Sequence, residues 1–279
     1  MLIKKTKSRR KDTALFILMA SSLILVLFIL GFILVYIAVQ SAGYLNFSFL
    51  RGAEGIFPMI VSTVYVVLLS LGIALPIGVM TALYLNEYAS ETRLIRFVRL
   101  AIETLAGIPS ILYGLFGLLM FCRFFGLGQS IAAGAATLSI MILPIIIRTT
   151  EESLKTIPDE LRQGSLSLGA TRFQTIVHVV LPGALPGILT AAILAIGRVV
   201  GESVPVLLTV GITRNLPSSI FESGRTLTIH LYYLTKEAIA PDDFGKAFAT
   251  AGVLVIVVMI VNTAAKIFAG AFKKRWGRQ

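Results

Sequence analysis

Six uncharged, largely apolar runs follow one another along the chain, separated by shorter charged segments. The stretches without Asp, Glu, Lys or Arg are 13–50, 55–86, 104–122, 124–147, 173–197 and 247–265. A helix needs about 20 apolar residues to cross the hydrocarbon core of a bilayer, and these runs lack the alternation typical of barrel strands. The pattern predicts six spanning helices, at about 14–38, 60–85, 103–122, 129–148, 184–211 and 247–268.

The composition excludes most other classes of protein. Hydrophobic residues make up 56% of the 279 positions and charged residues 14%, against about 25% charged residues in an ordinary soluble domain. There is no Gly-X-Y period, and the single Cys122 cannot form an internal disulfide. The first apolar run is longer than the core of a secretory signal, which predicts a retained anchor. We therefore expect an all-α polytopic membrane protein.

The basic residues are distributed as a membrane topology requires. Six spans place both termini on one side, and that side carries sixteen Lys and Arg in the tails 1–13 and 271–279 and in the segments 86–100 and 149–182. The opposite side carries six. Cationic residues are retained on the cytoplasmic side, so both termini are predicted to be cytoplasmic. A net charge of +11 arranged in this way does not resemble a nucleic-acid patch.

No catalytic motif accompanies this pattern. The chain lacks a G-x-x-x-x-G-K-[ST] loop for nucleotide phosphates and a G-x-S-x-G elbow. His178 and His230 fall on opposite faces of the predicted membrane, which argues against a shared metal site and favours two interfacial polar residues. Cys122 is expected only to pack. We predict a protein that is not an enzyme, with no cofactor and no metal.

Charges inside the predicted spans are the strongest functional signal. Arg198 lies near the middle of the fifth span, where an arginine costs at least about 2.5–3.5 kcal/mol, and Glu202 follows one turn later on the same face. Such residues mark substrate pathways, although the pair could instead only lock helices together. Arg148 ends the fourth span, where it could line the pathway or extend to the headgroups.

The regions around Arg198 and beyond it carry further expectations. The pairs Gly183/Gly187 and Gly197/Gly201 would let a neighbouring backbone approach closely, and two prolines should bend this helix. On the far side of the membrane, the stretch 227–234 is expected to form a short surface helix with its tyrosines at headgroup level.

The segment 149–182 carries a specific motif. It reads Gln163-Gly-Ser-Leu-Ser-Leu-Gly169, then nine residues, then Val179-Val-Leu181-Pro182. This resembles the EAA loop of bacterial ABC importer permeases, although Gln, Gly and Val replace the usual Glu, first Ala and Ile. The resemblance implies two short helices with an elbow at Gly169. It also implies docking of a separate ATPase at the residues of the motif: Gln163, Gly164, Ser165, Gly169, Leu181 and Pro182.

Further motifs resemble the phosphate transport permeases, a branch of the binding-protein-dependent transport permeases (the CysTW group of type I importers). They are Gly107-Ile-Pro-Ser-Ile-Leu-Tyr-Gly-Leu-Phe-Gly117, Arg148-Thr-Thr-Glu-Glu-Ser153, Gly169-Ala-Thr-Arg-Phe-Gln-Thr-Ile176 and Arg198-Val-Val-Gly-Glu-Ser-Val-Pro205. Two of these motifs, the Pro that follows Gly-Glu-Ser-Val and the run Arg-Thr-Thr-Glu-Glu, resemble the PstA branch of the family more than the PstC branch. The resemblance covers a permease domain at 58–270, after the helix 14–38, and implies that Arg148, Arg198 and Glu202 line the phosphate pathway.

The resemblance also implies partners. One such subunit forms half of a pathway, so a PstC-like permease, a PstB-like ATPase dimer and an external PstS-like phosphate-binding protein are expected in the inner membrane of a bacterium. Three alternatives remain open: a permease for molybdate, tungstate or sulfate, an ion-driven secondary carrier using Arg198 and Glu202 as a relay, and a structural scaffold.

Overall fold

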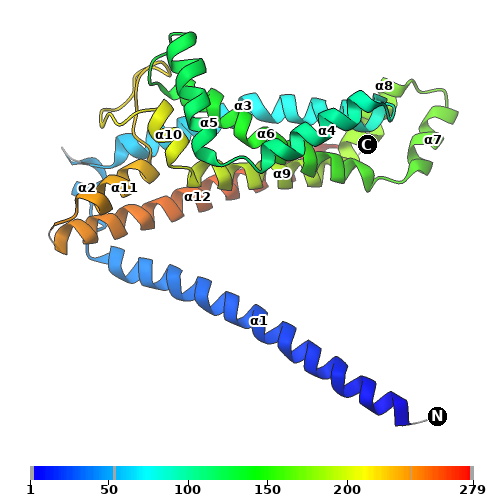
Figure 1. Cartoon of the computed structure of the whole chain (residues 1–279), viewed down its shortest axis with the longest axis horizontal. Helices are drawn as coiled ribbons and strands as arrows, with labels where there is room; N and C mark the ends of the chain where they lie inside the picture. The colour runs from blue at the N-terminus through cyan, green and yellow to red at the C-terminus, as the bar shows by residue number, and fades with distance from the viewer. Residues whose placement is uncertain (1–2, 53–54, 240, 277–279) are drawn as a thin grey trace.

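The computed structural model describes residues 3–52, 55–239 and 241–276, and every regular element in these ranges is a helix. The outermost residues of the predicted tails, 1–2 and 277–279, lie outside the described residues. Long helices run side by side along one axis, while the N-terminal helix diverges from them (Figure 1). The predicted all-α class is confirmed.

Three of the six predicted spans correspond closely to helices of the structure. They are α1 (Ile3–Ala42), α3 (Phe57–Leu83, extended by the π-helical turn Tyr84–Tyr88) and α12 (Pro241–Trp276). Their membrane-compatible portions are Asp12–Ala42, Phe57–Tyr88 and Asp242–Ile267, which match the predicted first, second and sixth spans. Long apolar runs without interruption thus identify these helices correctly.

The third predicted span, 103–122, is wrong as a single helix. The chain forms α4 (Arg93–Ala106) and then α5 (Ser110–Gly117) with a π-helical extension, Leu118–Phe124, and the two halves are bent by 101°. Gly107 caps α4, and Pro109, in an extended conformation with ψ of 138°, precedes α5. Proline lacks the N–H that would continue the α4 hydrogen-bond ladder, so the helix stops there. Counting this bent pair as one span gives six.

The fourth and fifth spans also differ from the prediction. Helix α6 (Ile131–Lys155) continues well past residue 148. The fifth span begins early, at α8 (Arg172–Thr175), passes through a π-helical turn (Ile176–Val180) into α9 (Leu181–Gly201), and ends there. Glu202 is extended, with ψ of 135°, and a separate helix, α10 (Val204–Thr209), follows. The predicted continuous helix 184–211 is therefore wrong, and the chain is broken at residues 202–203.

Helix α6 occupies the middle of the bundle, between α3 and α9. Its buried residues Leu138, Met141 and Ile142 pack with Val66 and Val67 of α3 and with residues of the last turns of α9. A Cβ on Gly187 would lie 2.2 Å from the Cβ of Ser153, so α9 approaches α6 closely there, as the first glycine pair predicted. Among the described residues, nothing lies within 4 Å of such an atom on Gly197 or Gly201, and Gly201 instead lines a cavity that residues of α11 and α12 also line.

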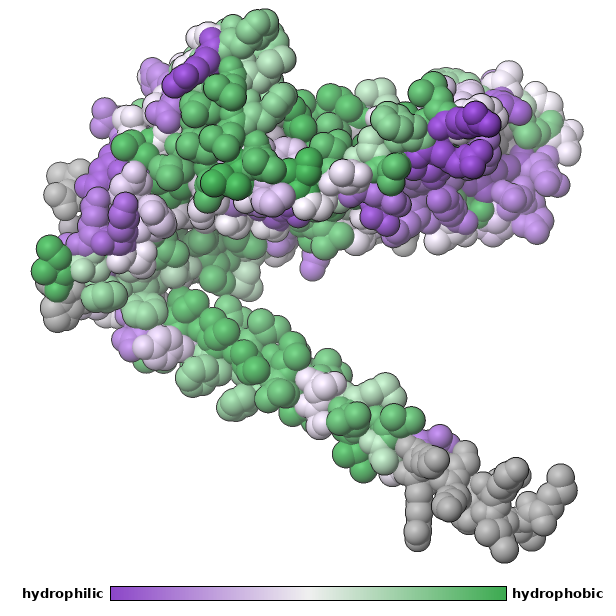
Figure 2. All heavy atoms as spheres, in the orientation of Figure 1, coloured by the Kyte–Doolittle hydropathy of each residue, from purple (hydrophilic) through white to green (hydrophobic). Residues whose placement is uncertain are grey.

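The two ends of the bundle carry different elements. One end, the α7 end, carries α7 (Asp159–Ser167) and α8, and hydrophilic residues gather there (Figures 1 and 2). The other end, the α11 end, carries α2 (Phe47–Arg51) and α11 (Leu227–Glu237). Hydrophobic residues cover α1, which stands apart from the bundle over most of its length (Figure 2). It meets α12 near the α11 end, where the rings of Tyr36 and Phe248 lie 5.5 Å apart.

Candidate functional site

Arg198 lies close to the middle of the bundle's depth. Ser153 of α6 donates a hydrogen bond to the carbonyl of Ala184 in α9 at 3.2 Å, which fixes how the two antiparallel helices are aligned. Counting along both helices from this contact places Arg198 level with about residue 139, about 6 Å from the midpoint of α6. Arg198 therefore lies near the middle of α6's length, although it belongs to the last turn of α9.

Within the described residues, the guanidinium of Arg198 has an ionic partner and no hydrogen-bond partner at its Nε. Its Nε lies 3.8 Å from a carboxylate oxygen of Glu202, close enough for electrostatic attraction and too long for a hydrogen bond. The Arg198 side chain is 32% exposed, yet its Nε is buried and has no hydrogen-bond partner within the described residues. A buried donor without a partner is costly, which makes Arg198 a candidate site for a hydrogen-bond acceptor.

Two helix breaks come together around Arg198. One break follows Gly201, three residues after Arg198, and the other separates α4 from α5. Helix α10, after the first break, packs on α5, after the second, so closely that a Cβ on Gly114 would lie 2.9 Å from Pro205. Tyr113 of α5 donates a hydrogen bond to the carbonyl of Leu105, in the last turn of α4, and so closes the bend between the two helices. Non-helical backbone at membrane depth is tolerated only where protein covers it or where it lines a water-filled space.

The side of α9 that carries Arg198 is open. Leu194 is 51% exposed, and Gly197 and Gly201 have empty space where a side chain would be. The ionic partner of Arg198 within the described chain is Glu202, on its own segment. A lock between helices would instead pair the arginine with a residue of another helix. Arg198 thus faces a region outside this bundle.

Arg148 lies elsewhere, about 13 Å nearer the α7 end by helix rise. Its side chain is half exposed and lies 3.9 Å from Glu103 of α4. Next to it, Glu151 contacts both Arg99 of α4 and Lys155. Cations and carboxylates are balanced in this cluster, which comprises Arg99, Glu103, Arg148, Glu151, Glu152 and Lys155. The structure therefore does not bring Arg148 and Arg198 into one site.

The predicted ATPase-docking residues fall into two groups. Gln163 and Gly164 are exposed on α7, and Gly169, with φ of +89°, makes the turn between α7 and α8 that only glycine adopts easily. Ser165 is 3.0 Å from the hydroxyl of Thr175 and so joins the two short helices. Leu181 and Pro182 lie instead in the first turn of α9, where Leu181 packs on the core.

Arg162 anchors α7 to the bundle, a contact that no local sequence pattern predicts. Its guanidinium bonds Glu87, at the end of α3's π-helical turn, at 3.1 Å and the carbonyls of Leu154 and Ile157 at 2.9 and 2.6 Å. The Arg162 and Glu87 side chains are only 16% and 12% exposed. Glu87 belongs to the π-helical extension of α3 and Leu154 to the last turn of α6, whereas Ile157 lies in the connection after α6, so Arg162 ties α7 to the ends of two spanning helices.

Large apolar side chains stand exposed beside this anchor. Leu168 is 91% exposed and Phe173 68%, and Leu161 and Leu166 are also exposed. Apolar groups collected on a polar segment mark a contact surface for another protein. In the sequence, the sign of this apolar surface is a set of leucines within the otherwise charged and polar segment 149–182.

The two histidines differ in their surroundings. His178 is exposed at the α7 end, where its Nδ1 lies 3.0 Å from the carbonyl of Gln174. His230 lies on α11 and is buried, 5% exposed, so its predicted interfacial position is wrong. The reason is that α11 packs on α12 and buries Leu227 and Ile229 rather than lying on a surface. Burial, followed by the charges of Arg214 and Arg225, lowers the pKa of His230 to about 4.

A bundle of broken helices, with an arginine–glutamate pair beside one break and a polar elbow anchored to its spanning helices, fits a membrane permease of the ABC importer type, a subunit without catalytic function. The chain belongs to the family described as binding-protein-dependent transport system inner membrane components, whose model matches residues 74–278. It is accordingly a multi-pass protein of the inner membrane.

Named relatives and solved structures agree with this family. The chain is 34% identical over 251 residues to the probable ABC transporter permease protein YqgI of Bacillus subtilis, covering 83% of this chain and 85% of that one. It is 36% identical over 238 residues to the phosphate transport system permease protein PstA 1 of Mycobacterium tuberculosis H37Rv, covering 82% and 76%. A chain of a bacterial ABC transporter involved in alginate import has the same fold, with a TM-score of 0.66 at 15% identity over 98% and 99% of the two chains. A chain of the inward-facing methionine transporter MetNI gives a TM-score of 0.60 at 23% identity over 78% and 94%.

The low pKa of His230 gives a prediction at the α11 end. The folded chain holds a neutral imidazole, whereas the unfolded chain takes up a proton near pH 6.5. The unfolded state therefore binds more protons between pH 6.5 and about 4, and this region loses stability as the pH falls through that window. NMR titration of histidine-labelled protein should show a His230 midpoint near 4, raised in Arg214→Gln. A wild-type midpoint near 6.5 would contradict the burial and charges described.

Proposed function

We propose that this subunit forms half of the pathway of an ATP-driven phosphate importer. The observation that carries the proposal is Arg198: a guanidinium at mid-depth, beside two broken helices, with its Nε unpaired and its face open. The PstA proteins among its relatives support phosphate as the substrate.

An arginine suits an oxyanion for electrostatic and geometric reasons. Phosphate carries one to two negative charges, and bringing it through a low-dielectric region without a counter-charge would be prohibitive. The guanidinium keeps its proton and presents a planar fork of donors that matches two oxygens of a tetrahedral anion. Glu202, 3.8 Å away, lowers the local positive charge, so the anion is attracted without being trapped.

A second permease would complete the pathway. The α9 side at Gly197 is open, and α1 contacts the described chain only near the α11 end, through α12. An apolar helix that stands apart from its bundle over most of its length is suited to contact another subunit in the membrane. A homologous PstC-like permease facing Arg198 would enclose the water-filled space that the two helix breaks require.

The two ends of the bundle suggest where an ATPase and an external binding protein would dock. The distribution of basic residues, sixteen against six, favours the α7 end as cytoplasmic. A PstB-like ATPase dimer would dock on Gln163, Gly164 and the exposed Leu168 and Phe173, and its closure would act on the spanning helices through Arg162. A PstS-like protein would deliver phosphate at the α11 end.

Other readings of the site predict other behaviour. A permease for molybdate, tungstate or sulfate would use the same cationic site, and competition separates these substrates. An ion-driven carrier would need no ATPase, but the exposed apolar residues of α7 and α8 then have no partner. A pure helix lock is disfavoured because the ionic partner of Arg198 lies in its own segment.

Replacing Arg198 tests the proposed pathway. Arg198→Gln should reduce uptake of radiolabelled phosphate by the reconstituted transporter about tenfold or more, since charge-assisted hydrogen bonds to the anion are lost. Arg198→Lys should restore uptake only in part, because a point charge lacks the fork. Arg123→Gln, which removes an arginine outside the site, is the matched control. Molybdate and sulfate should compete weakly.

The double variant Arg198→Gln, Glu202→Gln separates pathway from lock. With the assembled complex quantified by subunit stoichiometry, the pathway account expects normal assembly without transport. Transport by the double neutral variant would rule out the pathway role of Arg198.

Gly169→Val tests the docking elbow. A β-branched residue at φ of +89° costs about 1–3 kcal/mol in backbone strain, so ATPase association should weaken roughly tenfold while membrane insertion persists. Gly126→Val places comparable strain, at φ of +69°, in an open turn on the other side of the bundle and should leave association unchanged. Equal association and stimulated ATP hydrolysis in wild type and Gly169→Val would show that the elbow does not hold the ATPase.

A further inference from the structure

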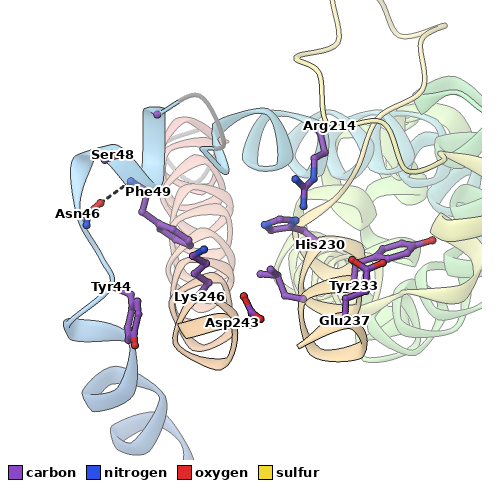
Figure 3. A pocket seen from close by; sticks show the side chains of 12 residues that line it. Tyr44, Asn46, Ser48, Phe49, Arg214, His230, Tyr233, Glu237, Asp243 and Lys246 are labelled. Carbon is purple, nitrogen blue, oxygen red and sulfur yellow. Dashed lines mark hydrogen bonds between the residues drawn. The ribbon is translucent and has the colours of Figure 1, made fainter. Parts of the chain in front are cut away.

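A large cavity opens at the α11 end, away from Arg198. Its volume is about 610 Å³, and it lies between the α1–α2 connection, α11, α12 and the loop after α10 (Figure 3). Six of its lining side chains bear on its chemistry: Tyr44, Arg214, His230, Glu237, Asp243 and Lys246. They come from four separate segments, so the fold as a whole assembles this cavity.

His230 forms the buried wall of the cavity. It is 5% exposed, and its Nδ1 is buried and has no hydrogen-bond partner within the described residues. Figure 3 shows the imidazole next to the guanidinium of Arg214, facing the cavity. An unmet polar group in such a position calls for an explanation, and a bound polar molecule supplies one.

Positive charge around His230 is only partly compensated. Arg214 has no ion pair or hydrogen bond within the described residues, and Lys246 reaches the same space from α12 (Figure 3). Arg225 lies behind them, held by the carbonyl of Ile212 at 2.9 Å and by the ring of Tyr233 at 4.7 Å. Burial is the main cause of the low pKa of His230, and the charges of Arg214 and Arg225 add to it.

The cavity also contains acceptors. Glu237 and Asp243 line it, and Asp243 already accepts a hydrogen bond from the backbone of Ile239 at 3.2 Å. Carboxylates repel an anion that has no proton to share, but they accept a hydrogen bond from one that retains a hydroxyl. Phosphate at neutral pH retains at least one hydroxyl proton, whereas sulfate has none. A cavity that offers both cationic donors and carboxylate acceptors, such as Lys246 and Asp243 on neighbouring turns of α12, therefore favours the protonated oxyanion.

We propose that this cavity is a second anion site, which binds hydrogen phosphate outside the central pathway. Arg214 and Lys246 donate to its oxygens, the His230 imidazole adds a polar contact, and Glu237 accepts from its hydroxyl group. The choice of phosphate rests on the proposed function. The site would concentrate the substrate at the α11 end and select it against sulfate before it reaches Arg198.

Equilibrium dialysis of the full chain in lipid nanodiscs with radiolabelled inorganic phosphate tests the proposal. Arg214→Gln and Lys246→Gln should each weaken binding about ten- to hundredfold, as expected for the loss of a charged hydrogen bond. Arg123→Gln, outside the cavity, and Arg198→Gln, at the central site, should keep the cavity affinity. Excess sulfate should not displace phosphate from wild type, whereas it should from Glu237→Gln.

The decisive measurements use a chain that also carries Arg198→Gln, so that the proposed central site does not contribute. Three results would overturn the proposal: no phosphate binding by that chain, binding that survives when either cavity substitution is added to it, or equal displacement of its phosphate by sulfate. Thermal unfolding of each variant checks that it is folded, and the two independent variants keep the test valid if one is not. Phosphate uptake by the assembled transporter, measured in parallel, separates the claims. Uptake without cavity binding contradicts only this site, and cavity binding without uptake contradicts the proposed function.

Discussion

The burial of a charged arginine in a nonpolar bundle is the constraint on which the rest of the structure depends. Arg198 lies at mid-depth with its Nε unpaired and with its nearest carboxylate at 3.8 Å. At that depth an unpaired cation is tolerated only beside water, an anion or another subunit. The open face at Gly197, the break after Gly201 and the bend between α4 and α5 all provide such surroundings, and each would be a defect in a helix facing lipid.

The short helices α7 and α8 are connected structurally to the segment that carries Arg198. Arg162 joins α7 to Glu87 and to the carbonyls that end α6, while α9 continues from α8 to Arg198 without a break. Movement of α7 and α8 is thereby coupled mechanically to the segment that carries the arginine. A rigid-body transition of this kind suits an importer whose energy source lies in another subunit.

Sequence reasoning located the spans whose apolar runs were uninterrupted and missed the places where helices stop. Hydropathy records the transfer of side chains into lipid and is blind to the backbone, so the bend at Gly107 and Pro109 went undetected inside an uncharged run. Pro205 was expected to bend a helix, whereas it begins a new one after the extended Glu202. The turn at Gly169 was predictable because its spacing is local. The Arg162–Glu87 pair and the cavity around His230 join residues far apart in the chain, and no local pattern encodes them.

The central claim, that the Arg198 face borders a water-filled passage, can be tested by thiol accessibility. In the assembled transporter with Cys122 replaced by serine, a cysteine at position 197 should react with a charged, membrane-impermeant thiol reagent, because the reactive thiolate forms only in water. Phosphate should slow that reaction. A cysteine at Met259, exposed on α12 within a span, should remain unreactive. If Gly197→Cys were as unreactive as Met259→Cys, the Arg198 face would border lipid or closely packed protein, and the account of the pathway would be wrong.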